Sequence, residues 1–353
     1  MQNKKTRIGL ALSGGGMRAT VFHLGVLKHL AQADCFDQIA SLSSVSGASL
    51  CVGAIFAANQ NRWPTGQEFL NRVLPKVRAT ILGADIQKAA VVRLPFSPCR
   101  WLDRTRMIAR MLEKKWGISG NLQDLPVYPY WEINCTTFET GKRFRIRRDF
   151  MGDYTIGYTQ KPTLPTSEMM AASAGFPILI GPYILKTDEM RWTKDKWGKG
   201  EEAPVAPRYA LWDGGVYDNL GLEALYKIGR GLDSEIDFLI ISNASPGIAY
   251  QTRSRNFSLG NVHRLLDIAM FQVDALRSRS VFSSIISRGQ GVYIQIGAGA
   301  GHPVEGHLSP EEAALVRDHP TTLRTPTPTQ FDRILRHGCE MAYRSCKTGM
   351  VEN

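Results

Sequence analysis

Long apolar runs, paired cysteines and clustered histidines are all missing from this chain of 353 residues. No run reaches the roughly 18–20 apolar residues that span a bilayer, so we expect no transmembrane segment. The first apolar run, residues 7–12, ends in a glycine cluster rather than a cleavage site, which predicts a strand and not a signal peptide. The six cysteines lack CxxC spacing and predict free thiols in a reducing, cytoplasmic setting. The seven histidines are scattered, so no metal and no cofactor are expected.

Acidic residues are in the minority, with 32 Asp and Glu against 43 Lys and Arg, and the net charge of +11 predicts an anionic partner. The densest basic run is Lys142–Arg148, where Arg143, Arg145 and Arg147 share one face at strand period. We expect a solvated strand face whose charges discourage edge pairing, with contact to anionic lipid headgroups as the alternative. No aromatic platform or recognition-helix pattern accompanies the run, so no nucleic acid is expected.

Two strand–turn–helix units in succession begin the chain, and they predict an α/β sheet with helices on its faces. The first joins a strand at 7–12 to a helix at about 18–33, and the second joins a strand at 39–44 to a helix at 49–58. Later patterns predict a mainly helical stretch at 63–120 with a Pro-aromatic insert at 94–104, a hairpin of 130–137 and 142–148, a helix at 168–174, a surface loop at 186–208, strands at 209–212, 236–242 and 291–296, and a helix at 329–346.

The second of these turns carries a serine. The segment Ser43–Ser49 lies between a short apolar run and a helical one, and small residues flank Ser46 on both sides. A serine on a tight strand-to-helix turn is typical of a nucleophile elbow, which exposes the hydroxyl at a helix N-terminus. Ser46 is therefore the candidate nucleophile of a hydrolase or acyltransferase, with Ser44 and Ala48 standing where glycines are usual.

The first turn is rich in glycine and is compatible with two functions. Gly14, Gly16 and Ala19 fit a dinucleotide-binding fingerprint, but the acid expected at the end of the second strand is absent. No Gly-Lys-Ser/Thr follows either, which excludes the common phosphate-binding loop. Successive glycine N–H groups can instead hold the charge that develops on a carbonyl oxygen under attack. Both turns open at the carboxyl edge of a parallel sheet, which favours this oxyanion hole.

A serine hydroxyl needs a base, and the residues alone leave two bases open. Asp213 ends a strand, and Gly214 and Gly215 after it let the chain fold close to a neighbouring loop. An ordinary turn aspartate is the competing interpretation. The alternative base is the histidine of a Ser–Asp–His triad. Five downstream histidines are candidates for it: His263, His302, His307, His319 and His337.

Four segments, in this order along the chain, resemble those of the patatin-like phospholipase family. They are Ser13–Ala19, the elbow around Ser46, Ala171–Pro177 and Asp213–Asn219, and the stretch Asn134–Phe144 is similar as well. The resemblance implies a three-layer α/β/α sandwich around a central, mostly parallel sheet. It also implies a single domain over residues 1–353, with a catalytic core at about 7–250 and a C-terminal extension at about 251–353.

The same resemblance implies a phospholipase A or lysophospholipase that cleaves fatty-acyl esters through a Ser–Asp dyad without histidine. In a water-poor site, burial is expected to raise the pKa of the base. The implied roles are Ser46 as nucleophile, Asp213 as base, Gly14, Gly15 and Gly16 as the oxyanion hole with Arg18 in support, and Gly47, Gly214 and Gly215 as supporting glycines.

The implied partners are a phospholipid substrate and an anionic membrane surface, met peripherally at its cytoplasmic face. The basic surface and the insert around Phe96 and Trp101 are expected to dock there. The departures at Ser44 and Ala48 keep one alternative open, which is a non-catalytic lipid-binding protein on a decayed hydrolase scaffold.

Overall fold

A central mixed sheet runs through the molecule in the computed structural model, which describes residues 6–91, 104–177, 180–201, 203–248, 259–298 and 307–351. Its parallel half places the two predicted strand–turn–helix units side by side, because β1 pairs directly with β2. In order across the sheet, this half consists of β13 (Gly291–Gln295), β12 (Phe238–Asn243), β1 (Ile8–Leu12), β2 (Ile39–Val45) and β3 (Tyr130–Thr137).

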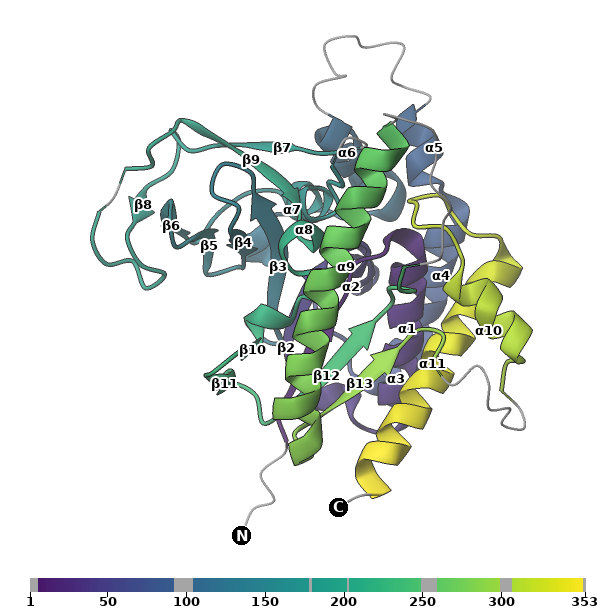
Figure 1. The fold of residues 1–353 in the computed structure, drawn as a ribbon. Helices are drawn as coiled ribbons and strands as arrows, with labels where there is room; N and C mark the ends of the chain where they lie inside the picture. The colour runs from purple at the N-terminus through teal and green to yellow at the C-terminus, as the bar shows by residue number, and fades with distance from the viewer. Residues whose placement is uncertain are drawn as a thin grey trace.

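Beyond β3 the sheet becomes antiparallel and forms a lobe to one side of the molecule (Figure 1). The far end of β3 also pairs with β9, which places Asp213 opposite Cys135. The antiparallel strands are β4 (Arg143–Ile146), β5 (Phe150–Asp153), β6 (Gly157–Gln160), β7 (Tyr183–Lys186), β8 (Trp192–Thr193) and β9 (Arg208–Asp213), with β10 (Tyr226–Lys227) and β11 (Gly231–Leu232) in a separate pair.

Helices cover both faces of the parallel half (Figure 1). Alternate residues of a strand point to opposite faces, and accordingly Leu10 and Leu12 lie in one apolar core while Ala11 lies in another. The first core includes residues of α1 and α11, and the second includes residues of α9. The helices are α1 (Gly16–Gln32), α2 (Gly47–Ala58), α3 (Gly66–Glu68), α4 (Leu74–Gly83), α5 (Ile86–Val91), α6 (Arg104–Trp116), α7 (Thr166–Ser173), α8 (Gly215–Asp218), α9 (Leu259–Ser284), α10 (Pro310–Arg317) and α11 (Pro328–Val351).

The architecture confirms the three-layer α/β/α fold. None of the helices within the described ranges is both long enough and apolar enough to cross a membrane. The five cysteines that the structure describes are free thiols, as expected. The Pro-aromatic insert, including Phe96 and Trp101, lies outside the described residues apart from Arg104.

The basic run at 142–148 does not form a solvated face, contrary to the prediction. β4 is an internal strand between β3 and β5, and Arg143 is buried in an ion pair with Glu132 at 3.3 Å. The guanidinium of Arg145 lies over the Phe150 ring, 5.2 Å from its centroid. Charge alone did not reveal this, because the acid and the ring that cover the arginines come from neighbouring strands.

Three other stretches also differ from the prediction. The loop expected at 186–208 contains β8, whose Trp192 is buried and pairs with Thr159 of β6. The helices α9 and α10 lie where the sequence pattern predicted no element. The failure to predict α9 matters most, because this helix forms a wall of the site described next.

Candidate active site

Ser46 occupies the sharp turn between β2 and α2. Its backbone angles are φ 53° and ψ −117°, a region that residues with a side chain rarely adopt. The turn closes because Gly47 has no side chain, since a Cβ there would lie 2.1 Å from the carbonyl oxygen of Gly16. The residue is only 8% exposed and lines a cavity of about 560 Å³. The predicted elbow geometry is therefore present.

The glycine loop lies directly against this turn. A Cβ on Gly14 would lie 3.3 Å from Cβ of Ser46, and Gly15 and Gly16 both line the cavity. Gly15 and Gly16 have φ angles of 137° and 62°, which favour glycine. Among the described residues, neither of their N–H groups has an acceptor.

Gly14 must be corrected from an oxyanion donor to a spacing residue. Its N–H already donates to the carbonyl of Asn219 at 3.0 Å and is not free for a ligand. A side chain at Gly14 would also lie 2.5 Å from Oδ1 of Asn219. Gly14 thus permits Asn219 to pack beside Ser46, and two N–H groups of the loop remain without an acceptor instead of three.

Arg18 lies next to the glycine loop and donates to two backbone carbonyls and one side-chain hydroxyl. Its Nε donates to the carbonyl of Ala244 at 3.2 Å, Nη2 donates to Oγ1 of Thr321 at 3.0 Å, and Nη1 donates to the carbonyl of His319. Burial lowers the pKa of Arg18 to about 10, so the guanidinium stays charged at neutral pH. The arginine therefore ties the loop to the segment at 319–321, which sequence reasoning could not place.

Asp213 ends β9 beside the elbow and is only 3% exposed. Burial raises the pKa of its carboxyl to about 6, while hydrogen bonds from the Gly215 N–H and the Ser46 hydroxyl hold it lower than burial alone would. The Gly215 bond to Oδ1 is 2.8 Å long. Gly214 allows the tight exit from the strand, because a Cβ there would lie 2.4 Å from the carbonyl oxygen of Asn134. The expected rise in the pKa of Asp213 is confirmed in direction.

A chain of hydroxyl groups lies beneath the elbow, and the motifs did not reveal it. The N–H of Ser46 donates to Oγ of Ser173 at 3.0 Å, and Ser173 donates to the carbonyl of Asn134 at 2.8 Å. Ser49 lies 3.0 Å from Ser173, and Ser44 lies 2.9 Å from Ser49. Ser44 therefore has a structural role at a position where glycine is usual in such elbows.

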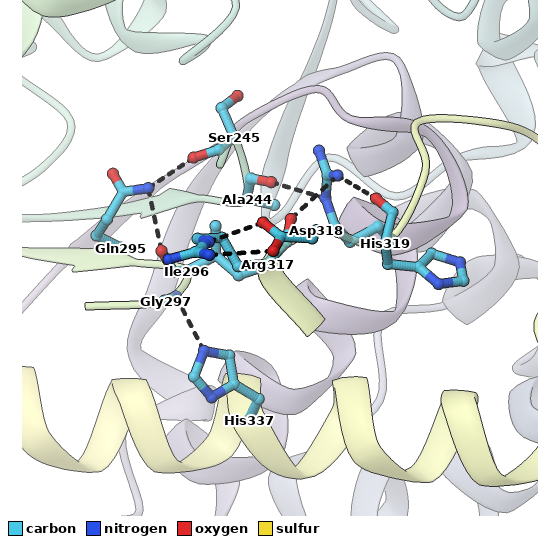
Figure 2. Close-up of polar contacts among 10 residues, drawn as sticks. Ala244, Ser245, Gln295, Ile296, Gly297, Arg317, Asp318, His319 and His337 are labelled. Carbon is cyan, nitrogen blue, oxygen red and sulfur yellow. Dashed lines mark hydrogen bonds and ion pairs between the residues drawn. The ribbon is translucent and has the colours of Figure 1, made fainter. Parts of the chain in front are cut away.

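No histidine lines the cavity among the residues that the structure describes. His319 contributes its carbonyl to Arg18, and His337 accepts from the Gly297 N–H at 2.9 Å (Figure 2). His307 accepts from Nε of Arg344 at 3.2 Å. His302 lies outside the described residues, as does the side chain of His263.

The remaining walls of the cavity are mostly apolar and come from segments far apart in the sequence. Met107 and Ile108 belong to α6, and Met270 and Phe271 belong to α9. Burial of an acyl chain against such side chains is favourable, at about 25 cal/mol per Å² of apolar surface. The cavity thus joins an apolar chamber to a serine, a carboxyl and two free N–H groups.

Comparison with known proteins identifies the class. A family model for patatin-like phospholipases matches residues 10–226, which is more than half of the chain, so the chain belongs to this family of lipid acyl hydrolases. The predicted family and fold are confirmed. No curated protein sequence matches.

Among solved structures, the chain is similar to human GIVD cytosolic phospholipase A2, with a TM-score of 0.58 and 12% identity. The match covers 100% of this chain and 62% of that one, so this chain spans less than two thirds of its neighbour. The same human protein in complex with methyl γ-linolenyl fluorophosphonate matches with a TM-score of 0.55, 12% identity and coverage of 99% and 60%. At this identity the likeness describes the fold.

Proposed function

We propose that this protein is a serine acyl hydrolase that cleaves fatty-acyl esters of membrane lipids through a Ser46–Asp213 dyad. One observation carries the proposal: Ser46 and the buried Asp213 line the same cavity as Gly15 and Gly16, whose N–H groups have no acceptor among the described residues. Nucleophile, base and oxyanion donors thereby occupy one chamber with apolar walls, as acyl transfer requires.

The reaction proceeds in two halves. Asp213 takes the Ser46 proton as Oγ forms a bond to the ester carbonyl carbon, and the carbonyl oxygen becomes an oxyanion on the N–H groups of Gly15 and Gly16. When the carbon–oxygen ester bond breaks, the leaving alcohol receives that proton from Asp213. Water then attacks the acyl-enzyme, again losing a proton to Asp213, and Ser46 regains a proton as the fatty acid leaves.

The environment of Asp213 makes it a usable base. An aspartate at the ordinary pKa near 4 holds a serine proton poorly. Burial raises the pKa of Asp213 to about 6, which brings it closer to neutral pH while leaving it ionised there. The hydrogen bond from Gly215 orients the carboxylate toward the elbow.

Covalent labelling tests the proposal directly. We expect a fluorophosphonate to label Ser46 in the wild type, and the label to be absent from Ser46→Ala. Ester hydrolysis is expected to fall to background in Ser46→Ala and in Asp213→Asn, with both proteins folded by circular dichroism. Full activity of either variant would refute the dyad. Absence of both labelling and hydrolysis in the wild type would favour the non-catalytic scaffold.

A Ser–Asp–His triad is the second candidate mechanism. It requires a histidine at the dyad, and among the described residues none lines the cavity. Individual His→Gln variants at the five downstream positions are expected to keep hydrolysis. Loss of activity in a folded single variant would establish the triad instead.

Two further parts of the proposal concern the whole chain. We propose that the protein docks peripherally on anionic membrane surfaces, supported by the net charge of +11. Vesicle binding is expected to weaken with salt and with loss of anionic lipid. We also propose that residues 251–353 belong to the same domain as the catalytic core, because Arg18 of the core contacts Thr321 and His319.

A further inference from the structure

Two buried polar side chains contact the backbone of the glycine loop, and the proposed dyad mechanism has no role for either. His23 belongs to α1 and Ser13 follows β1, and both are fully buried. Neither is among the described residues that line the active-site cavity. Buried polar groups bond within the protein, and both of these side chains bond to carbonyls at the start of the loop.

His23 has both of its ring nitrogens in hydrogen bonds. Nε2 lies 2.9 Å from the carbonyl oxygen of Ser13, and Nδ1 lies 2.8 Å from Oγ of Ser242. A carbonyl can only accept, so Nε2 carries the proton and donates it, and Nδ1 accepts from the Ser242 hydroxyl. Burial lowers the pKa of His23 to about 4, against the raising effect of its bond to Ser13, so the ring is neutral near pH 7. The ring is therefore held in one tautomer and is not available as the base of a triad.

The hydroxyl of Ser13 also has a single direction. Its Oγ accepts the Ala244 N–H at 2.8 Å and lies 3.2 Å from the carbonyl oxygen of Gly14. Because the N–H group can only donate and the carbonyl can only accept, the hydroxyl proton of Ser13 points to Gly14. Two consecutive carbonyls, those of Ser13 and Gly14, are thus held by buried side chains.

These contacts set the direction of an oxyanion donor. A trans peptide unit is planar, and its N–H group points opposite to its C=O group. The bond from Ser13 Oγ to the Gly14 carbonyl therefore also directs the Gly15 N–H, which has no acceptor among the described residues. The preceding peptide is held at both ends, because His23 binds the Ser13 carbonyl and the Gly14 N–H donates to the Asn219 carbonyl at 3.0 Å.

The loop needs these contacts because glycine has no side chain to restrict it. The φ angle of Gly15 is 137°, and a peptide between two glycines can rotate with little steric resistance. A reversed Gly14–Gly15 peptide would present the Gly14 carbonyl to the substrate oxygen in place of the Gly15 N–H. An oxyanion hole is effective only when its donors are fixed before the charge develops.

We propose that His23 and Ser13 are positioning residues, which act through the carbonyls of Ser13 and Gly14 to hold the Gly15 N–H toward the oxyanion. The proposal rests on the proposed hydrolase function. It adds to the dyad a second pair of residues, neither of which touches substrate. It also gives a histidine a role in acyl transfer that is not the role of a base.

Two substitutions of His23 separate this role from a general loss of packing, because each keeps one of the two bonds. Gln places an amide N–H near the position of Nε2 and can still donate to Ser13, whereas Asn can accept from Ser242 but is too short to reach Ser13. We expect His23→Asn to lower kcat by about 10-fold or more with KM within about twofold. His23→Gln is expected to keep kcat within about threefold of the wild type. Thermal melting of each variant sets a temperature at which all of them are folded.

Ser242→Ala is the matched control. It removes the donor to Nδ1 and leaves the bond from Nε2 to Ser13, so it is expected to lower the melting temperature and to keep kcat.

Ser13→Ala tests the second residue independently. The Gly14 carbonyl loses its donor, so kcat is expected to fall by about 10-fold or more with little change in KM. In this variant and in His23→Asn, the midpoint of the pH profile near 6 is expected to stay in place, because burial, Gly215 and Ser46 still set the pKa of Asp213. A general distortion of the site would move that midpoint.

The outcomes distinguish the positioning role from the enzyme. Wild-type kcat in folded His23→Asn or in folded Ser13→Ala would overturn the role of that residue and leave the dyad standing. Equal losses in His23→Gln and His23→Asn would assign the effect to packing of the ring, and would also overturn the role of His23. If neither His23 variant folds, Ser13→Ala decides. A wild type that hydrolyses no ester and is not labelled at Ser46 would refute the hydrolase function and the positioning role together.

Discussion

The backbone N–H of Ser46 donates to Oγ of Ser173, which comes from a helix more than 120 residues further along the chain, at 3.0 Å. Trp131 donates to Ser44 at 2.8 Å at the other end of the same hydroxyl chain. The indole N–H of Trp131 can only donate, and the carbonyl of Asn134 can only accept. Each hydroxyl between them therefore donates its proton toward the Asn134 end of the chain. Ser173 is therefore always the acceptor of the Ser46 N–H, and the chain holds the strained turn in a single arrangement.

Ser173→Ala is expected to reduce kcat by about 10-fold or more with little change in KM. The variant leaves the buried Ser46 N–H without an acceptor, a loss of about 1–3 kcal/mol, and frees the turn that aims the nucleophile. Ser44→Ala, at the remote end of the chain, is the matched control and is expected to have the smaller effect. Steady-state kinetics on one ester would test this order, and equal kcat values for Ser173→Ala and the wild type would contradict it.

The pH profile of kcat/KM is expected to rise through a pKa of about 6 and then level off. Asp213 must be ionised to take the serine proton, and burial raises the pKa of its carboxyl to about 6. Below that pH the rate falls about tenfold per unit. A histidine base would titrate in the same range, so the temperature dependence of the apparent pKa is the control. A carboxyl ionises with almost no enthalpy change, and a strongly temperature-dependent midpoint would point to an imidazole.

Asp213→Asn is expected to stabilise the fold at pH 8 and not at pH 4. The pKa of Asp213 rises from 3.8 to about 6 in the folded state, so the folded state binds more protons between these values. The stability that the protonated carboxyl contributes is present below pH 4 and is lost as pH rises through 6. At 1.36 kcal/mol per pKa unit this amounts to about 3 kcal/mol. Chemical denaturation of both proteins at the two pH values measures it, and equal stabilisation at both would show that the effect is not titration.

The sequence was sufficient for the parts of the site that depend on local chain geometry. Ser46 follows the buried strand β2 and Asp213 ends β9, each at a glycine turn, and such turns leave a local pattern. Strand order could not be read locally, so the pairing of Asp213 with Cys135 was not foreseen. The predicted role of Gly14 failed for the same reason, because the carbonyl that accepts its N–H belongs to Asn219.

The parts of the site that lie away from Ser46 and Asp213 left weaker signals in the sequence. α9 carries polar residues along much of its length, and only the face that meets the cavity is informative once the fold is known. Arg18 was identified through a motif, yet its partners at Ala244 and His319 are backbone carbonyls, which any residue type supplies. A contact that does not depend on residue type cannot be found from residue types.

Gly47→Ala is expected to abolish most of the activity by separating the elbow from the oxyanion loop. The added Cβ would lie 2.1 Å from the Gly16 carbonyl oxygen, so one of the two turns must move. Because oxyanion donors work only within hydrogen-bond reach, a shift of that size is expected to cost about 100-fold or more in kcat. Gly83→Ala, where a Cβ would meet nothing within 4 Å, is the matched control and is expected to keep wild-type rates. Overpacking also costs about 1–3 kcal/mol of stability, so the rates are compared well below the melting temperature of each variant. A folded Gly47→Ala with undiminished kcat would mean that Gly16 does not hold the oxyanion.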